Sequence, residues 1–345
     1  MLAMRKFTAA IVCLLVVFAA FGFGCNDTPE EHIHTPTVET EVQGINVVEV
    51  TSCSECHEII SETTVARYLA KGILLDAVDT SKVTIESAEG LINFSAVMNS
   101  TYEEPEGYVA LNKKVFANKT LYLGADIDLS GTMWTPINLD NASIDLTLDG
   151  QGHTITGLTL NGSTDIGFVG LLQKNNTVKN LNFDSAKLTT TGRWCGFLVG
   201  HQESGTLTVE NVNFTNCKLW GTVIPYSIRL GCIVGYCNLE GCSIDVKNCS
   251  VDSSEFYGYH NTCALIGTLA GAQAHEDRWS ITGCSVTNNK FYIGTSTPMY
   301  VNPFTVDTTY MERDAMEQYI EERGNTQENN TFEYGVTQNP FTPDL

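Results

Sequence analysis

The sequence predicts an all-β fold, a right-handed parallel β-helix over residues 81–300, with short capping helices and a small N-terminal β-module. Three observations predict it. An apolar spacing recurs along the chain, apolar and polar residues alternate around it, and a Gly or Asn stands at a fixed place within it. A spacing that recurs every few tens of residues is typical of stacked units, none of which buries its apolar face alone.

The recurring spacing joins four apolar positions at steps of three, two and five residues. Full copies begin at Val178, Val209, Val246 and Ile281 and a partial copy at Ile155, so successive copies start 23, 31, 37 and 35 residues apart. The alternation and the many β-branched residues predict strands, not helices. The remaining members of the full copies are Leu181, Phe183, Leu188, Val212, Phe214, Leu219, Cys249, Val251, Phe256, Cys284, Val286 and Phe291.

The step of three interrupts the alternation and predicts a bend in each copy. The residue before the second apolar position is Gly157, Asn180, Asn211, Asn248 or Gly283. Gly and Asn tolerate the left-handed backbone conformation better than other residues do. We therefore expect a corner between two strands in every unit, and a corner repeated in each unit makes a coil of strands.

Several cysteines fall within the repeats. Cys249 and Cys284 occupy the second apolar position of their copies, so we expect them to point inward as small apolar residues. Free buried thiols are favoured over a disulfide between them because a strand ladder rarely supplies disulfide geometry. Cys232, Cys237 and Cys242 lie close together in the sequence, but their spacing is irregular and no histidine accompanies them. A structural role is favoured for these three over a metal site.

Both ends of the coil are expected to carry capping helices, since open strands expose backbone groups. Before the repeats, Ser87 is the predicted N-cap of a helix with Leu91, Phe94 and Met98 on one face. After them, a capping-box pattern precedes an apolar stripe, and a glycine ends the predicted helix. The residues of this second pattern are Thr309, Glu312, Met311, Ala315, Met316, Tyr319, Ile320 and Gly324.

The chain opens with a segment typical of bacterial lipoproteins. Arg5 and Lys6 precede an apolar run over residues 9–23 that is short for a membrane span and suits a signal-peptide core. Cys25 follows this run, and we expect it to carry a lipid; an ordinary secretory signal is the alternative. The protein is therefore expected in the cell envelope, on the outer surface or secreted, and held to the membrane through the lipid.

A Cys53-x-x-Cys56-His57 segment has the spacing of a covalent haem attachment. About 25 residues separate His57 from the β-region, and they contain no histidine, which is too little chain to enclose a haem. Haem is therefore not expected. His32 and His34 complete a set of two histidines and two cysteines that suits tetrahedral zinc. A small zinc-stapled module and a disulfide or free thiol pair remain equal alternatives.

Short glycine motifs lie between the copies: "GFVG" at 167–170, "GFLVG" at 196–200, "GCIVG" at 231–235 and "ALIG" at 264–267. With the upstream "LYLGADIDLSGTMWTPI" and "LTLDGQGHTITGLTL", they resemble the GLUG repeats of bacterial surface proteins. The "EHIHTP" and "CSECHEIISETT" stretches also resemble a short module of such proteins. The resemblance implies a β-helical cell-surface stalk or binding module, and it transfers no catalytic residue.

These patterns divide the chain into four parts. They are a signal peptide over residues 1–25, an acidic linker with the His/Cys module over 26–80, the β-helix with its N-terminal cap over 81–300, and a capping helix and tail over 301–345.

Charge and aromatic content restrict the function. The formal net charge of −21 leaves no basic stripe for a phosphate backbone, so nucleic acid is excluded as a partner. The loops between the later copies are rich in aromatic residues that either stack on sugar rings or pack over the coil, namely Trp220, Tyr226, Tyr257 and Tyr259. We therefore expect an adhesive protein that binds a glycan or another host or cell-surface ligand. A carbohydrate-active enzyme on the same scaffold is the first alternative, but the acidic residues are scattered and none is assigned to catalysis. A purely structural spacer is the second.

Overall fold

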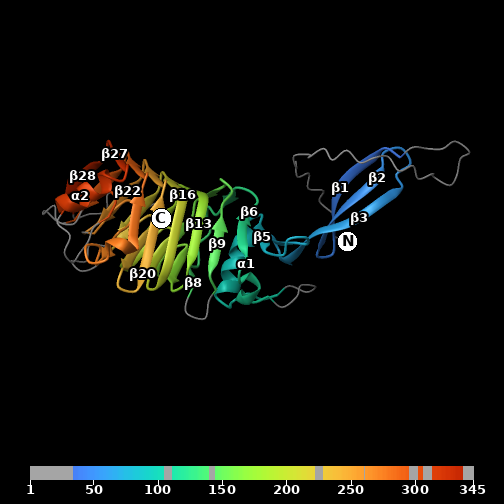
Figure 1. The fold of residues 1–345 in the computed structure, drawn as a ribbon, viewed down its shortest axis with the longest axis horizontal. Coiled ribbons are helices and arrows are strands. Elements are labelled where there is room, and N and C mark those ends of the chain that lie inside the picture. The colour runs from blue at the N-terminus through green and yellow to red at the C-terminus, as the bar shows by residue number, and fades with distance from the viewer. Residues whose placement is uncertain are drawn as a thin grey trace, which may run out of the picture. The chain divides into compact units, whose positions relative to one another are not determined.

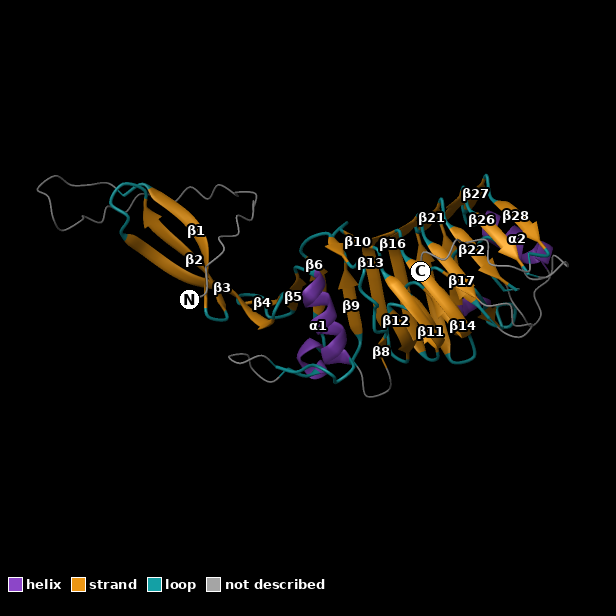
Figure 2. Ribbon diagram, turned by 180° about the vertical axis from the view of Figure 1, so that it is seen from behind, coloured by secondary structure: helices purple, strands orange, loops and turns teal. Residues whose placement is uncertain are grey.

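The computed structural model describes residues 34–104, 111–139, 144–221, 228–259, 261–294, 302–305 and 313–336. These described residues fall into two compact units: residues 34–42 with 48–64, and residues 43–47 with the described residues from 65 to 336. Strands dominate the described residues, and two α-helices accompany them (Figure 2). None of the helices within the described ranges is both long and apolar enough to cross a membrane.

The first unit is built on three adjacent strands, β1 (Pro36–Gln43), β2 (Asn46–Cys53) and the start of β3 (Ile59–Ala70) (Figure 1). A two-residue loop joins β1 to β2, so the two strands form an antiparallel hairpin. Its first residue, Gly44, has a φ of 65°. All of β1 is exposed, whereas β2 buries Val48, Val50 and Cys53.

The second unit begins with an antiparallel meander of β3, β4 (Ile73–Asp76) and β5 (Lys82–Ile85). Helix α1 (Ala88–Met98) follows. The Ser87 hydroxyl accepts a hydrogen bond from the Gly90 backbone N–H, and Leu91, Phe94 and Met98 are buried on one face. The first predicted capping helix is therefore confirmed in its N-cap and in its buried face.

Beyond α1 the strands form three sheets in which every pair of known register is parallel (Figure 2). Along the chain, strands of the first, second and third sheet follow one another in turn. The all-β class and the parallel arrangement are thus confirmed. The first sheet contains β6 (Thr120–Leu123), β7 (Ile127–Asp128), β9 (Leu146–Asp149), β10 (Thr154–Thr156), β13 (Asn176–Asp184), β16 (Gly205–Thr215), β20 (Cys242–Lys247), β21 (Ser250–Asp252), β24 (Trp279–Thr282), β25 (Ser285–Thr287) and β27 (Thr326–Glu328).

The second and third sheets contain fewer strands than the first. The second contains β11 (Thr159–Ile166), β14 (Lys187–Gly196), β17 (Lys218–Gly221), β18 (Leu230–Gly231), β22 (Glu255–Gly258), β26 (Lys290–Ile293) and β28 (Thr331–Tyr334). The third contains β8 (Ile137–Leu139), β12 (Val169–Leu172), β15 (Val199–Gln202), β19 (Val234–Asn238) and β23 (Leu269–Ala270).

The predicted equivalence of the four full copies is confirmed. Val178 pairs with Val209, Val209 with Val246, and Val246 with Ile281. The other apolar positions stack in the same way and are buried. The ring centres of Phe183 and Phe214, for example, lie 5.1 Å apart. Burying each such side chain stabilises the fold by about 1.5–3 kcal/mol.

The register predicted for the partial copy is wrong. Ile155 pairs with Phe183, and the residue opposite Val178 is Leu148. The partial copy therefore starts at Leu148, 30 residues before the copy at Val178, and not 23 residues before it. The cause is an extra turn over residues 151–153 between β9 and β10, where the His153 backbone N–H bonds the Gly150 carbonyl. This turn shifts the apolar positions that follow it.

The predicted corners adopt the left-handed conformation. Asn180, Asn211, Asn248 and Gly283 have φ between 52° and 64°. Gly157, at 69°, belongs instead to a second corner, where it lies beside Ser185. This second corner was not predicted, and its other members, all with φ between 51° and 57°, are Asn216, Ser253, Asn288 and Asn329.

The C-terminal helix α2 spans Arg313–Glu321. Met316 and Ile320 are buried, and the Tyr319 ring lies 4.1 Å from that of Trp279, as expected of a cap. Ala315 is exposed, so its assignment to the apolar stripe is wrong. Gly324, with φ 71°, follows the end of the helix. Three residues of the predicted pattern, Thr309, Met311 and Glu312, lie outside the described residues.

Candidate functional site

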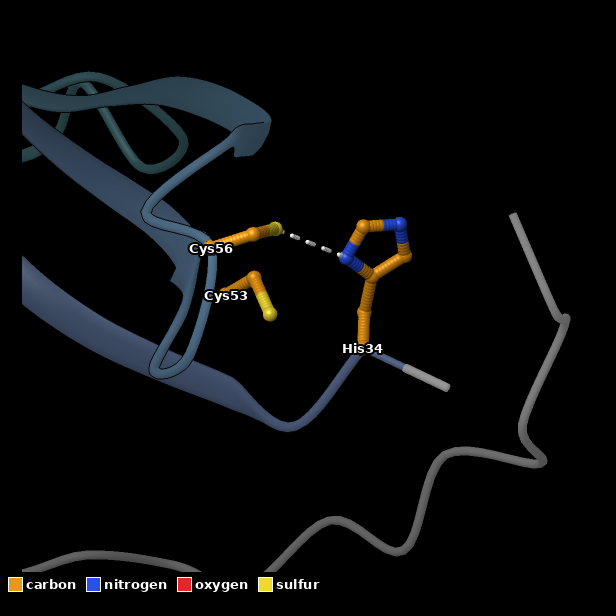
Figure 3. A group of neighbouring side chains, drawn as sticks. All are labelled: His34, Cys53 and Cys56. Carbon is orange, nitrogen blue, oxygen red and sulfur yellow. Dashed lines mark hydrogen bonds between the residues drawn. The ribbon is translucent and has the colours of Figure 1, made fainter. Parts of the chain in front are cut away.

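His34, Cys53 and Cys56 form a cluster in the first unit that could hold a metal ion (Figure 3). One ligand atom from each residue lies within 4.8 Å of the other two, and the Cys56 sulfur is 3.6 Å from Nδ1 of His34. Cys53 is fully buried, whereas Cys56 is exposed. Within the described ranges this is the one group of three or more metal-ligating side chains at such distances.

A tight turn after β2 brings the two cysteines together. The Cys53 carbonyl accepts from the His57 backbone N–H, and the Cys53 N–H bonds the Glu58 carbonyl, both at 2.9 Å. The Ser54 N–H bonds the Thr35 carbonyl at 2.9 Å, which holds the segment next to His34 against the same turn. His57 has a φ of 60° and does not belong to the cluster.

The donor set suits a borderline or soft metal. Thiolate and imidazole ligands are those of zinc and related transition metals, whereas calcium and magnesium prefer oxygen. Oε2 of Glu58 lies 3.9 Å from Nε2 of His34, on the ring nitrogen that Cys56 does not approach. A carboxylate there can hold the ring in orientation for a metal on Nδ1. The predicted fourth ligand, His32, lies outside the described residues, as does the lipidation candidate Cys25.

A second group of side chains gathers on the second unit. We name it the Trp194 cluster; its members are Asp165, Trp194, His201, Arg229 and Tyr236. The Trp194 ring lies 4.3 Å from that of His201 and 5.4 Å from that of Tyr236, nearly parallel to the latter. The guanidinium carbon of Arg229 lies 4.7 Å from the centre of the Tyr236 ring. Nδ1 of His201 lies 3.3 Å from Oδ1 of Asp165, within ion-pair distance but not aligned as a hydrogen bond.

Strand register builds the first row of this cluster. Ile166, Cys195 and Leu230 are paired across β11, β14 and β18. The residues that precede them, Asp165, Trp194 and Arg229, are therefore stacked one unit apart. His201 and Tyr236 form a second row because they pair directly across β15 and β19.

The glycine motifs bring the two rows together. A Cβ on Gly196 would lie 2.4 Å from the Val199 carbonyl oxygen, and a Cβ on Gly200 would lie 2.6 Å from the Asp165 carbonyl carbon. Backbone therefore packs on backbone where the second sheet turns into the third, and only glycine leaves room for it. This close approach explains the glycines of the motifs at 167–170, 196–200 and 231–235.

The Trp194 cluster contains strained and partly desolvated groups. Trp194 has a φ of 57° and Asp165 a φ of 49°. This left-handed conformation is rare for a bulky ring such as that of Trp194, and residues forced into it cluster at functional sites. Nε1 of Trp194 is buried and has no hydrogen-bond partner within the described structure. Burial lowers the pKa of the Arg229 guanidinium and raises that of the Tyr236 hydroxyl.

The aromatic residues that the sequence singled out lie elsewhere and do not form one site. Trp220 and Tyr257 pair across β17 and β22, and Trp220 is partly buried. Tyr257 is only 1% exposed, and its hydroxyl donates to the Val336 carbonyl at 3.3 Å, so its ring offers no face to a ligand, contrary to prediction. Tyr259 is partly exposed, and Tyr226 lies outside the described residues.

An open polar groove of about 310 Å³ crosses the first sheet. Thr120, Thr147, Thr177 and Thr208 stand in register on four successive strands along it. Asp145 is the one carboxylate among its lining residues in the described ranges. Among the described residues that line the groove, Asp145 therefore has no second carboxylate beside it.

No family model matches the sequence, and no curated protein matches it. The chain is similar to a solved structure described as a putative immunoglobulin A1 protease from Bacteroides ovatus, with 14% identity, a TM-score of 0.29, and coverage of 73% of this chain and 84% of that one.

Proposed function

We propose that the protein is an exported surface protein that binds glycans through the Trp194 cluster, on a right-handed parallel β-helix related to the GLUG-type surface proteins. The observation that carries the proposal is the stack of Trp194 and Tyr236 beside one acid and one guanidinium. Each ring is partly exposed.

The cluster supplies the two kinds of contact that a sugar needs. The C–H face of a pyranose packs on an aromatic ring, while charged and polar groups bind the hydroxyls that surround it. The left-handed backbone at Trp194 costs conformational free energy. Such strain is retained where a side chain is needed at that position for binding. The stacked strands hold all these groups on a rigid scaffold.

Binding is favoured over the alternative of a carbohydrate-active enzyme. Hydrolases that use two carboxylates need both of them beside one glycosidic bond. The Trp194 cluster has one carboxylate, Asp165, and the threonine-lined groove has one, Asp145. Asp126 and Asp128, which stand near each other in sequence, both have structural partners. Asp126 accepts from the Thr154 backbone N–H across neighbouring strands, and Asp128 accepts from the Ser130 backbone N–H in a local turn.

The first unit serves in this proposal as a spacer between the lipid at Cys25 and the binding scaffold. Zinc bound by His34, Cys53 and Cys56, with His32 as the fourth ligand, stabilises the small module. A metal of this kind contributes directly to folding where the hydrophobic core is small.

The test is retention on immobilised neutral and acidic polysaccharides, using the full chain freed of its signal peptide. We expect at least one polysaccharide to retain the protein. Trp194→Asn should weaken that binding at least tenfold without lowering thermal stability by more than a few degrees, because Asn accepts the left-handed conformation. The matched control, Trp220→Ala, should bind like the wild type. Equal loss in both variants, or release of oligosaccharides by the wild type, would overturn the proposal.

A further inference from the structure

Two cysteine sulfurs lie unusually close together at one corner of the second unit. Sγ of Cys237 is 2.8 Å from Sγ of Cys242, a separation smaller than that of two non-bonded sulfur atoms. Both side chains are buried, at 0% and 3% exposure. Four residues separate them, in the turn that joins β19 of the third sheet to β20 of the first.

The preceding unit shows what these two positions do. Gln202 pairs with Cys237, and Gly205 pairs with Cys242. In that unit the Gln202 side-chain amide donates to the Gly205 carbonyl at 3.1 Å and closes the corner. The same two positions, one unit later, carry the two thiols.

We propose that Cys237 and Cys242 form a disulfide that closes this corner covalently. One thiolate attacks a disulfide-bearing oxidant, forms a mixed disulfide and expels one thiol of the oxidant. The second cysteine then attacks the mixed disulfide and expels the other thiol. The two cysteines lose two protons and two electrons, and the oxidant is reduced to two thiols. The inference draws on the proposed export for its oxidising compartment.

The surrounding structure holds the corner in place. Arg278 donates from one guanidinium nitrogen to the carbonyls of Leu239 and Glu240, at 2.9 and 2.8 Å. The Cys242 sulfur also lies 2.9 Å from the Asn238 carbonyl. Burial raises the pKa of Cys237, so the folded thiol is protonated and unreactive. The bond therefore forms while the corner is still open during folding.

The other buried cysteines lack this relationship. The sulfur of Cys284 accepts from the Cys249 backbone N–H at 3.4 Å, but these two residues stand at equivalent corners of neighbouring repeats, between β20 and β21 and between β24 and β25, and not on either side of one turn. Burial raises the pKa of Cys195, Cys217 and Cys263 to about 12, and their sulfurs bond to hydroxyl and carbonyl groups of the protein.

The test is thiol counting after refolding of the reduced full chain with oxidised glutathione, a condition that does not depend on export. Alkylation under denaturing conditions should modify two fewer cysteines than in the reduced protein, and peptide mapping should link Cys237 to Cys242. In the Cys237→Ser/Cys242→Ser variant this deficit should disappear, whereas Cys249→Ser/Cys284→Ser should keep it. Full alkylation of the refolded wild type, or a link to another cysteine, would overturn the inference. The same count on exported protein then tests the compartment separately.

Discussion

The side-chain amide of Asn211 donates to the side-chain oxygen of Asn180 at 3.1 Å, and both residues have positive φ, 54° and 52°. Asn180 in turn donates to the Asp149 carboxylate at 3.0 Å. The corner at Asn211 is therefore held twice: the residue takes the conformation that bends its own strand, and its side chain donates to the equivalent residue, Asn180, of the preceding repeat. Asn180 donates instead to Asp149, the register partner of Lys179.

Substitution of Asn211 should separate these two contributions. Asn211→Gly keeps the backbone conformation and loses the hydrogen bond, so we expect a loss of about 0.5–1.5 kcal/mol in the free energy of unfolding. Asn211→Val also forces a β-branched residue into the left-handed region, which adds about 1–2 kcal/mol. Urea unfolding of both variants measures the difference. Thr191→Val, at an exposed strand position, is the control for the valine itself. Equal losses for Gly and Val would contradict the conformational part of the argument.

The corner row illustrates what the sequence could predict. The Asn and Gly residues recur at a fixed place in an apolar pattern, so both their left-handed backbone and the register of four units follow from it. The register of the partial copy was predicted wrongly because its extra turn over residues 151–153 adds length without adding an apolar position. The second corner was missed because Ser185 and Ser253 alternate there with asparagines, and serine carries a weaker conformational signal.

The candidate sites differ in the same way. The approach of His34 to Cys53 and Cys56 could be predicted because histidine and cysteine are both ligands of zinc, and the two cysteines stand at metal-ligand spacing. The Trp194 cluster was not. Its members come from three successive repeats of the second unit, and a tryptophan in the left-handed region matches no sequence preference. The signal that could have found it is position: Trp194 stands two residues before a glycine motif, as Asp165 does.

The glycine motif itself gives a second prediction. A methyl group at Gly196 would meet the Val199 and Gly231 carbonyl oxygens at 2.4 and 2.9 Å, and backbone cannot move aside easily. Gly196→Ala should therefore cost at least about 3 kcal/mol or prevent folding, which is at the upper end of overpacking effects. Gly241→Ala, which meets only the Glu203 carbonyl at 3.0 Å, should cost about 1 kcal/mol or less. Soluble yield and urea unfolding compare the two. Similar stability of both variants would contradict the close-packed corner.

Zinc stoichiometry tests the first unit. Purified full chain, loaded with zinc and desalted, should retain one zinc ion per chain by elemental analysis. His34→Ala and Cys56→Ser should each reduce retention at least tenfold, since both supply an atom of the cluster. His57→Ala should retain zinc because His57 shapes the turn and lies outside the cluster. A wild type that retains no zinc would refute the proposed centre, and loss in His57→Ala alone would point to a different ligand set.

The Asp149 carboxylate predicts a dependence of stability on pH. Burial by itself raises its pKa, but hydrogen bonds from the Asn180 side chain and the Gln151 N–H, with the Lys179 ammonium 3.3 Å away, outweigh this and hold the pKa below its ordinary value of 3.8. A carboxyl whose pKa is lowered by folding stabilises the fold above its unfolded pKa, and this stabilisation is lost as the pH falls through the lower, folded value. Asp149→Asn should therefore be less stable than the wild type by about 1–3 kcal/mol at pH 7.

Below pH 3.8 this difference should shrink, because the wild-type carboxyl then becomes protonated and loses the same interactions. Urea unfolding of both proteins at pH 7 and at successively lower pH measures it. Thr191→Val exchanges no titratable group, so its difference from the wild type should be the same at every pH. A deficit in Asp149→Asn that stayed constant as the pH fell would mean that the loss comes from packing at the corner, and that the charge on Asp149 contributes nothing to it.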